Sequence, residues 1–148
     1  MKPLVLVDSN VLLDVITEDP VWGIWASETI TQLFDEYKLA INPIIYAEVS
    51  IRFSTIDELE EAIPSSFFTK LHVPYEAAFL AGKCYKKYKE RGGLKTSVLP
   101  DFLIGAHASV SNIKLVTRDI SRYKTYFPKL ELIAPLLTKL NLELRESQ

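Results

Sequence analysis

The chain contains 148 residues, of which 48% are hydrophobic and 24% are charged. These values are typical of one globular domain with a single core. The net charge of −2 excludes a protein that binds nucleic acid by bulk positive charge alone, although local basic patches stay compatible with it. The one cysteine, Cys84, excludes an internal disulfide. Because no apolar run could span a bilayer and no signal-peptide pattern is present, we expect a cytoplasmic protein with no membrane association.

The chain begins with an apolar run that stops at an acid and resumes as a helix. Residues 4–7 are predicted to form a fully buried strand of a parallel sheet. Asp8 follows at the carboxyl end of this strand, which is the end where open α/β folds bind ligands. Asn10 either holds the Asp8 carboxylate or caps the following helix.

The rest of the chain alternates between helix and strand patterns. Asn42 and Pro43 match a helix start, Thr55 and Glu58 match a capping box, and Asp101 stands where an N-cap belongs. The alternation predicts a three-layer α/β fold with a mainly parallel sheet. We expect helices at 22–37, 56–63, 75–91 and 102–110, and one that starts at Pro43 and carries Glu48. We expect strands at 38–41, 67–73, 114–116 and 130–133, and a helical turn at 123–127. Residues 1–135 form one domain in this interpretation, and 136–148 form an extension whose structure and role stay open.

Four acids fall at element ends or on a helix, and each has an ordinary alternative when taken singly. Asp8 and Asp101 could act only as helix caps, and Asp119 could only form a turn. Glu48 has apolar helix neighbours, which indicates a partly buried carboxylate, although a surface pair with Arg52 is the alternative.

Taken together, these acids point to metal chemistry. Carboxylates gathered at one edge of a sheet repel one another, which raises their pKa values unless a cation lies among them. Oxygen ligands suit Mg²⁺ or Mn²⁺, and one or two such ions can activate water and stabilise the leaving oxygen of a phosphodiester. His72 and His107 are expected to be structural residues, and no nucleophile motif or phosphate-binding glycine loop competes for the catalytic role.

Charged and aromatic residues near the acids provide further candidates. Lys95, Arg118 and Arg122 lie in or beside loops next to the acids, and we expect them to contact the phosphates of the substrate. Asp14 is expected to be a solvated charge, as is Glu143 in the extension. Trp22 and Trp25 are either core residues or part of an exposed groove for a partner helix.

Four sequence blocks occur in an order that resembles a known family. They are DSNVLLD at 8–14, NPIIYAEV at 42–49, LPDFLIGAHA at 99–108 after RGG at 91–93, and LVTRD at 115–119. The chain resembles the PIN-domain ribonucleases, specifically the VapC-type toxins. This resemblance implies a parallel five-stranded sheet in the order 3-2-1-4-5 and a Mg²⁺- or Mn²⁺-dependent endoribonuclease. It also implies inhibition by a VapB-type antitoxin and a homodimer.

The resemblance also implies roles for individual residues. Asp8, Glu48, Asp101 and Asp119 correspond to the four metal-binding acids of the family, in that order. Asn10 and Thr117 correspond to the polar residues that orient the acids or the metal-bound water. Antitoxins of this type dock across the early helices, which would place Trp22 and Trp25 at the antitoxin interface.

Two other functions stay open from the sequence. A catalytically silent PIN-like scaffold would keep the fold for binding, but four uncompensated acids would cost stability. A receiver-like phosphoacceptor domain also gathers acids around magnesium, yet it needs an acid pair on the first loop and a lysine after a late strand. Here Asn10 stands where a second acid would be needed, and Lys114 precedes the late strand.

Overall fold

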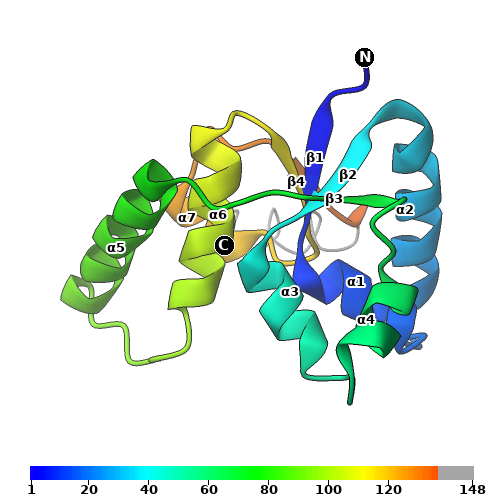
Figure 1. The fold of residues 1–148 in the computed structure, drawn as a ribbon. Helices are drawn as coiled ribbons and strands as arrows, with labels where there is room; N and C mark the ends of the chain where they lie inside the picture. Colours follow the sequence, from blue (N-terminus) through cyan, green and yellow to red (C-terminus); the bar gives the residue numbers. More distant parts are fainter. Residues whose placement is uncertain (137–148) are drawn as a thin grey trace.

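The structure is a computed structural model, and it describes residues 1–136 of the chain. Its strands are β1 (Leu4–Val7), β2 (Lys38–Ile41), β3 (Phe68–Lys70), β4 (Lys114–Val116) and β5 (Leu132–Ile133). Its helices are α1 (Ser9–Ile16), α2 (Gly23–Glu36), α3 (Pro43–Ser50), α4 (Ile56–Ala62), α5 (Tyr75–Glu90), α6 (Leu99–Val110) and α7 (Ser121–Tyr126). Figure 1 shows this arrangement.

The strands form one parallel sheet in the order β3-β2-β1-β4-β5, which confirms the predicted fold class and strand order. β1 lies in the middle, with Leu4 paired to Lys38 of β2 on one side and Val5 paired to Lys114 of β4 on the other. The chain therefore leaves β1 toward β2 and later returns to its other side as β4. This change of direction between β1 and β4 is a topological switch point, where open α/β folds bind their ligands.

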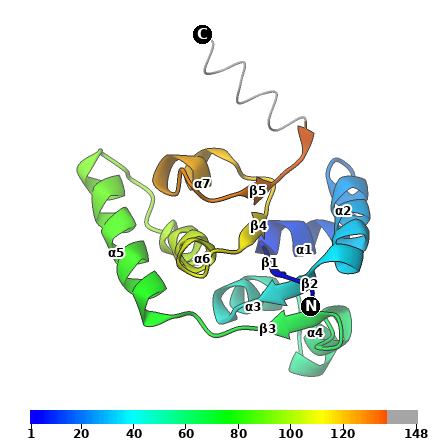
Figure 2. The ribbon, with the colours of Figure 1, turned by 90° about the horizontal axis from the view of Figure 1, so that it is seen from above.

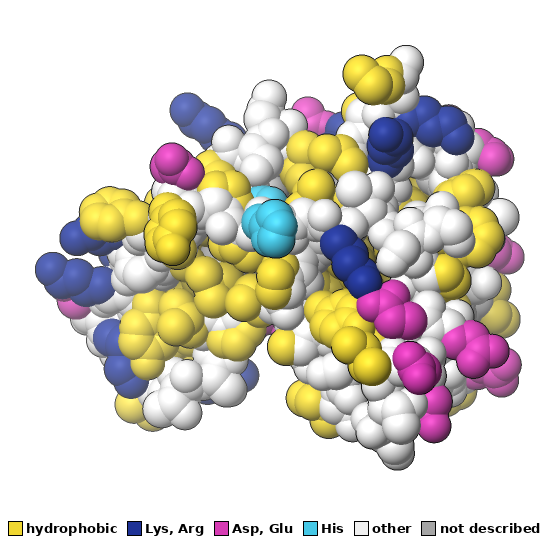
Figure 3. Space-filling view, viewed as in Figure 1, with side chains coloured by type: hydrophobic (Ala, Val, Ile, Leu, Met, Phe, Trp, Pro, Cys, Tyr) yellow, Lys and Arg dark blue, Asp and Glu magenta, His cyan; other side chains and the backbone are white. Residues whose placement is uncertain are grey.

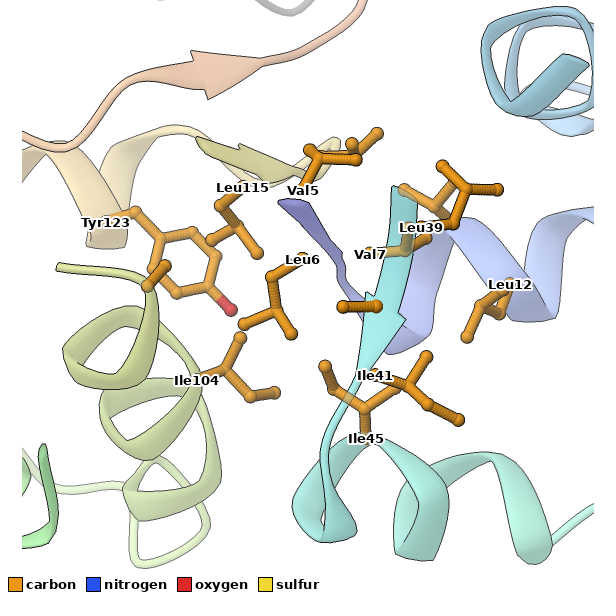
Figure 4. Close-up of a cluster of buried hydrophobic side chains, with 14 of the residues drawn as sticks. Val5, Leu6, Val7, Leu12, Leu39, Ile41, Ile45, Ile104, Leu115 and Tyr123 are labelled. Atoms are coloured by element: carbon orange, nitrogen blue, oxygen red, sulfur yellow. The ribbon is translucent and has the colours of Figure 1, made fainter. Parts of the chain in front are cut away.

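Helices cover both faces of the sheet. In Figure 2, α5, α6 and α7 lie on one side of the sheet and α1 and α2 lie on the other. The central strand β1 is apolar along its length, as expected of a strand with both faces covered, and its Val5, Leu6 and Val7 have no solvent exposure. Figure 4 shows their side chains packed with those of neighbouring strands and helices.

Helix starts follow the predicted caps at two positions. The Asn42 side chain accepts a hydrogen bond from the backbone N–H of Ile45 at 2.9 Å, with Pro43 at the first position of α3. The hydroxyl of Thr55 accepts from the N–H of Glu58 at 3.2 Å and starts α4. Both predictions are confirmed.

The predicted N-cap role of Asp101 is wrong. α6 begins at Leu99 with Val98 as its N-cap residue, so Asp101 lies within the first helical turn. The helix starts earlier because Pro100, which lacks an N–H, fits the first turn, where that donor has no partner in the helix. A carboxylate in the first turn still benefits from the positive end of the helix dipole.

The predicted third strand is longer than the observed one. β3 pairs only with β2, and only Phe68, Thr69 and Lys70 lie opposite β2 residues. Except for Leu136, the predicted extension at 136–148 lies outside the described residues, so its role stays a prediction. Within residues 1–136, none of the helices is long and apolar enough to span a membrane.

Candidate active site

The fold brings the four predicted acids to the edge of the sheet where the strands end. Asp8 follows β1, Asp119 follows the end of β4, Glu48 lies on α3 and Asp101 lies in the first turn of α6. The carboxylates are close enough for electrostatic coupling, since Asp101 and Glu48 raise the pKa of Asp8 and Asp119 raises the pKa of Asp101. One acid cluster therefore forms from segments far apart in the sequence.

Asp8 is the buried centre of the cluster, with 3% of its surface exposed. Its Oδ1 accepts the backbone N–H of Ser9 at 2.8 Å, so Asp8 also caps α1. Burial is the largest cause of a pKa raised to about 7, and hydrogen bonds from Thr117 and Tyr123 partly offset this rise. The cap and the cluster are therefore two roles of one carboxylate.

Glu48 is half-buried and accepts a hydrogen bond from the hydroxyl of Ser9 at 2.9 Å. Burial raises the pKa of Glu48, and the neighbouring carboxylate of Asp101 adds to this rise. Among the ion pairs of residues 1–136, none joins Glu48 to Arg52. The geometry therefore favours the interpretation of Glu48 as a site acid.

Asp101 is ion-paired with Arg122 of α7, and both side chains are largely buried. Burial raises the pKa of Asp101 even though the Arg122 guanidinium and the Lys95 ammonium lower it. Arg122 is thus the positive charge nearest to this acid, and the site carries a cation supplied by its own chain.

Thr117 connects the ends of β1 and β4. Its hydroxyl donates to Oδ2 of Asp8 at 2.8 Å and accepts the backbone N–H of Asp119 at 3.1 Å. The Asn10 amide lies 3.3 Å from the Thr117 hydroxyl and 3.4 Å from Oδ2 of Asp8. Asn10 and Thr117 therefore both contact the Asp8 carboxylate, and their role in orienting the acids stays a prediction.

The donor set fits a hard divalent cation, because every candidate ligand is a carboxylate oxygen. In the conformation described for residues 1–136, no three side chains of His, Cys, Asp or Glu are grouped closely enough to hold an ion. Glu48 and Asp101 are instead engaged by Ser9 and Arg122. Binding of a metal would require the carboxylates to move closer together, and Asp101 would have to release or share Arg122.

The predicted RNA contacts lie beside the cluster, with different surroundings. Lys95 is exposed, whereas Arg118 is bound to Asp14 and its guanidinium lies 5.9 Å from the centre of the Trp22 ring. Asp14 is 4% exposed, so the expectation of a solvated charge was wrong. The chain pairs this buried carboxylate with a cation more than 100 residues away, which its local sequence does not reveal.

The two tryptophans differ in their surroundings. Trp25 packs against the core, whereas Trp22 is half-buried beneath Arg118. Neither lines the apolar groove between α1, α2 and α4. Their role at an antitoxin interface stays a prediction.

Sequence reasoning missed two residues that contact the acids. The hydroxyl of Tyr123 donates to Oδ2 of Asp8 at 2.9 Å, and the hydroxyl of Ser9 bridges toward Glu48. Tyr123 was predicted only as part of a helical turn, and no sequence signal near it indicates its contact with β1. Ser9 directly follows Asp8, so its position beside the strand end was a usable signal.

His107 has the structural role expected of it. Its Nδ1 lies 2.9 Å from the Asn42 side-chain nitrogen, which itself belongs to the cap of α3. Burial lowers the pKa of His107 and keeps the imidazole neutral.

The sequence profile of the PIN domain family matches residues 5–128, and a search among curated protein sequences gives no match. Solved structures with similar folds include VapBC2 from Rickettsia felis, in a complex with a DNA fragment from the VapBC2 promoter. Its TM-score is 0.68 at 20% identity, and the match covers 89% of this chain and 98% of that chain. VapBC-1 from nontypeable Haemophilus influenzae has a TM-score of 0.67 at 18% identity, covering 88% of this chain and 97% of that chain. A toxin-antitoxin complex from Klebsiella pneumoniae has a TM-score of 0.62 at 22% identity, with 88% and 97% covered. Because the family match spans most of the chain and the strand order agrees with it, this protein belongs to the PIN domain family.

Proposed function

We propose that this protein is a Mg²⁺- or Mn²⁺-dependent endoribonuclease toxin of the VapC type, which a VapB-type antitoxin inhibits. The observation that carries the proposal is the cluster of four acids at the switch point of the sheet, with pKa values of Asp8, Glu48 and Asp101 raised by burial. Such a cluster is costly without a cation. PIN family membership and the similarity to VapBC structures support the same function.

Asp8, Glu48, Asp101 and Asp119 would hold one or two divalent ions, which when bound supply an activated water and stabilise the leaving oxygen of a phosphodiester. The chain's own residues prepare this site. Thr117 and Asn10 orient Asp8, Ser9 orients Glu48, and the first turn of α6 presents Asp101.

RNA is proposed to approach along the side of the site that carries basic residues. Lys95 is exposed and lies within electrostatic reach of Asp101. Figure 3 shows Lys and Arg side chains gathered over α5, Asp and Glu side chains over α4, and a hollow between these two parts of the surface. A polyanion is favoured on the first side and repelled on the second. Arg118 and Arg122 remain proposed phosphate contacts. To bind a phosphate, each would have to release its carboxylate partner or contact both groups at once.

Trp22 and Trp25 remain proposed antitoxin contacts, and we add an apolar groove of about 500 Å³ between α1, α2 and α4. Phe34 and Phe67 line it with their rings 5.3 Å apart, and both are exposed by more than a third of their surface. A groove with such walls suits the apolar face of a partner helix. A homodimer is proposed from the family resemblance alone.

The test uses purified antitoxin-free protein and total cellular RNA, with Mg²⁺, with Mn²⁺ or with a chelator. We expect discrete cuts that require the metal. The cleavage rate of Asp101→Asn should be at least about 100-fold lower, since replacing residues that only support metal ligands already lowers metal affinity or activity by about 10- to 100-fold. Asp57→Asn is the matched control, because Asp57 lies in the first turn of α4, away from the cluster. Equal behaviour of wild type and Asp101→Asn, with no thermal stabilisation by Mg²⁺, would establish the silent scaffold instead.

A further inference from the structure

We propose that Tyr123 is a positioning residue of the acid site, whose hydroxyl holds Oδ2 of Asp8 so that Oδ1 is directed to a divalent cation. The inference rests on the proposed function and adds a residue that the family resemblance did not assign. It follows from the hydrogen bonds around Asp8 and from the packing of α7.

The donors around Asp8 are distributed unevenly between its two oxygens. Oδ2 faces three side-chain donors, from Thr117 at 2.8 Å, Tyr123 at 2.9 Å and Asn10 at 3.4 Å. A carboxylate oxygen has two lone pairs, so these donors fill the hydrogen-bonding capacity of Oδ2. Within residues 1–136, Oδ1 accepts only from Ser9, through its N–H at 2.8 Å and its hydroxyl at 3.4 Å.

The Ser9 hydroxyl contacts both Asp8 and Glu48, and its hydrogen bond with Asp8 is the weaker one. The same hydroxyl lies 2.9 Å from the Glu48 carboxylate, which is the better hydrogen-bond distance. Oδ1 therefore retains a lone pair for a further electrophile, and a cation is the ligand that a carboxylate in a cluster of acids would favour.

Tyr123 is held where it can perform this role. Its side chain is 1% exposed, and Figure 4 shows its ring beside Leu115 and Ile104 with the oxygen pointing inward. Gly105 of α6 allows α7 to approach closely, because a Cβ there would lie 3.0 Å from the Tyr123 ring and 2.4 Å from the Phe127 ring. The ring cannot swing away without disturbing this packing.

The Tyr123 hydroxyl acts only as a donor to Asp8. A phenol with an ordinary pKa of about 10 keeps its proton at neutral pH, so the hydroxyl has a hydrogen to donate. A neutral donor stabilises the ionised Asp8 without adding a positive charge that would compete with the metal. Arg122, one residue earlier, does add such a charge at Asp101.

The test compares Tyr123→Phe with Tyr126→Phe. The second change removes the same hydroxyl from the same helix, at a position where it forms no hydrogen bond with an acid of residues 1–136. Mn²⁺ affinity is measured by calorimetry on the antitoxin-free protein, and kcat and KM are measured on an RNA that wild type cleaves. We expect about tenfold weaker Mn²⁺ binding and a lower kcat at unchanged KM for Tyr123→Phe. Tyr126→Phe should match wild type in Mn²⁺ affinity, kcat and KM.

The metal-induced rise in melting temperature provides a second readout. It compares each variant with its own metal-free form, so a variant of lower stability still reports on metal binding. Wild-type Mn²⁺ affinity and metal-induced stabilisation in Tyr123→Phe would overturn the proposal for Tyr123. If wild type itself binds no Mn²⁺ and cleaves no RNA, the proposed function fails instead, so the two failures are distinguishable.

Discussion

Arg118 and Asp14 form a two-point ion pair, with Nε 2.6 Å from Oδ2 and Nη2 3.3 Å from Oδ1. The Asp14 carboxylate is 5% exposed and the Arg118 side chain 36%. The backbone N–H of Arg118 lies 3.4 Å from the Asn10 amide oxygen. The pair therefore joins α1 to the segment after β4, and both segments carry site residues.

Breaking this pair from the arginine side should be costly. Arg118→Ala leaves a buried carboxylate without its cation, and we expect a loss of about 2 kcal/mol in the free energy of unfolding. Removing both partners in Asp14→Ala/Arg118→Ala should cost less than the sum of the two single changes. Urea denaturation of all four proteins measures this coupling. Glu90→Gln, which removes the exposed pair with Lys86, serves as the control and should change stability less.

The same Arg118→Ala protein tests the proposed phosphate contact. If Arg118 contacts RNA, its loss should reduce the slope of log affinity against log salt by about one. The measurement uses Asp101→Asn as the background, so that RNA stays intact during titration. Lys129→Gln is the control, since Lys129 lies beside Lys114 at the opposite end of β4. An unchanged slope would assign Arg118 to the Asp14 pair alone.

The acid cluster should make the metal-free protein less stable as pH rises. Asp8 has a pKa raised from 3.8 to about 7, so the folded state binds its proton more tightly than the unfolded state. The stability from this proton is complete below the unfolded pKa and is lost as pH rises through about 7. The full shift corresponds to on the order of 4 kcal/mol.

Urea unfolding with a chelator between acidic and mildly alkaline pH measures this loss. Asp8→Asn should make the stability depend less on pH. Some pH dependence should remain, because the pKa values of Glu48 and Asp101 are also raised. Mg²⁺ or Mn²⁺ should restore stability above neutral pH in wild type. A metal-free stability that increases with pH would contradict the prediction.

Arg122 and a metal ion should compete for Asp101. Arg122→Gln removes the ion-pair partner of Asp101, so we expect a less stable metal-free protein that binds Mn²⁺ about three- to tenfold more tightly. Calorimetry measures the affinity, and Arg91→Gln is the control because Arg91 is exposed and lies over the Tyr126 ring. Weaker Mn²⁺ binding in Arg122→Gln would mean that the guanidinium supports the site instead.

Gly105 should be intolerant of a side chain. A Cβ at this position would lie 2.4 Å from the Phe127 ring, so Gly105→Ala forces α6 and α7 apart and should cost about 1 to 3 kcal/mol. Gly82→Ala on α5 is the matched control, because a Cβ there meets no atom within 4 Å. It should be neutral or stabilising, as expected for alanine inside a helix. Thermal unfolding of both variants checks the contrast.

The sequence alone determined the order of the elements, and it predicted the four acids as site residues. Apolar runs mark the strands because both faces of a parallel sheet are buried, and local caps such as Asn42 act within one turn of the chain. Element boundaries were less certain where two local signals compete, as at Pro100 and Asp101.

Only the tertiary structure decided which side chains meet. The contact of Tyr123 with Asp8 and the pairing of Arg118 with Asp14 join residues separated by more than 100 positions. No local periodicity encodes such contacts, because they depend on how α7 and the end of β4 pack against β1 and α1. The burial that raises the pKa of Asp8 likewise comes from the assembled layers, since desolvation is a property of the surroundings and not of the residue.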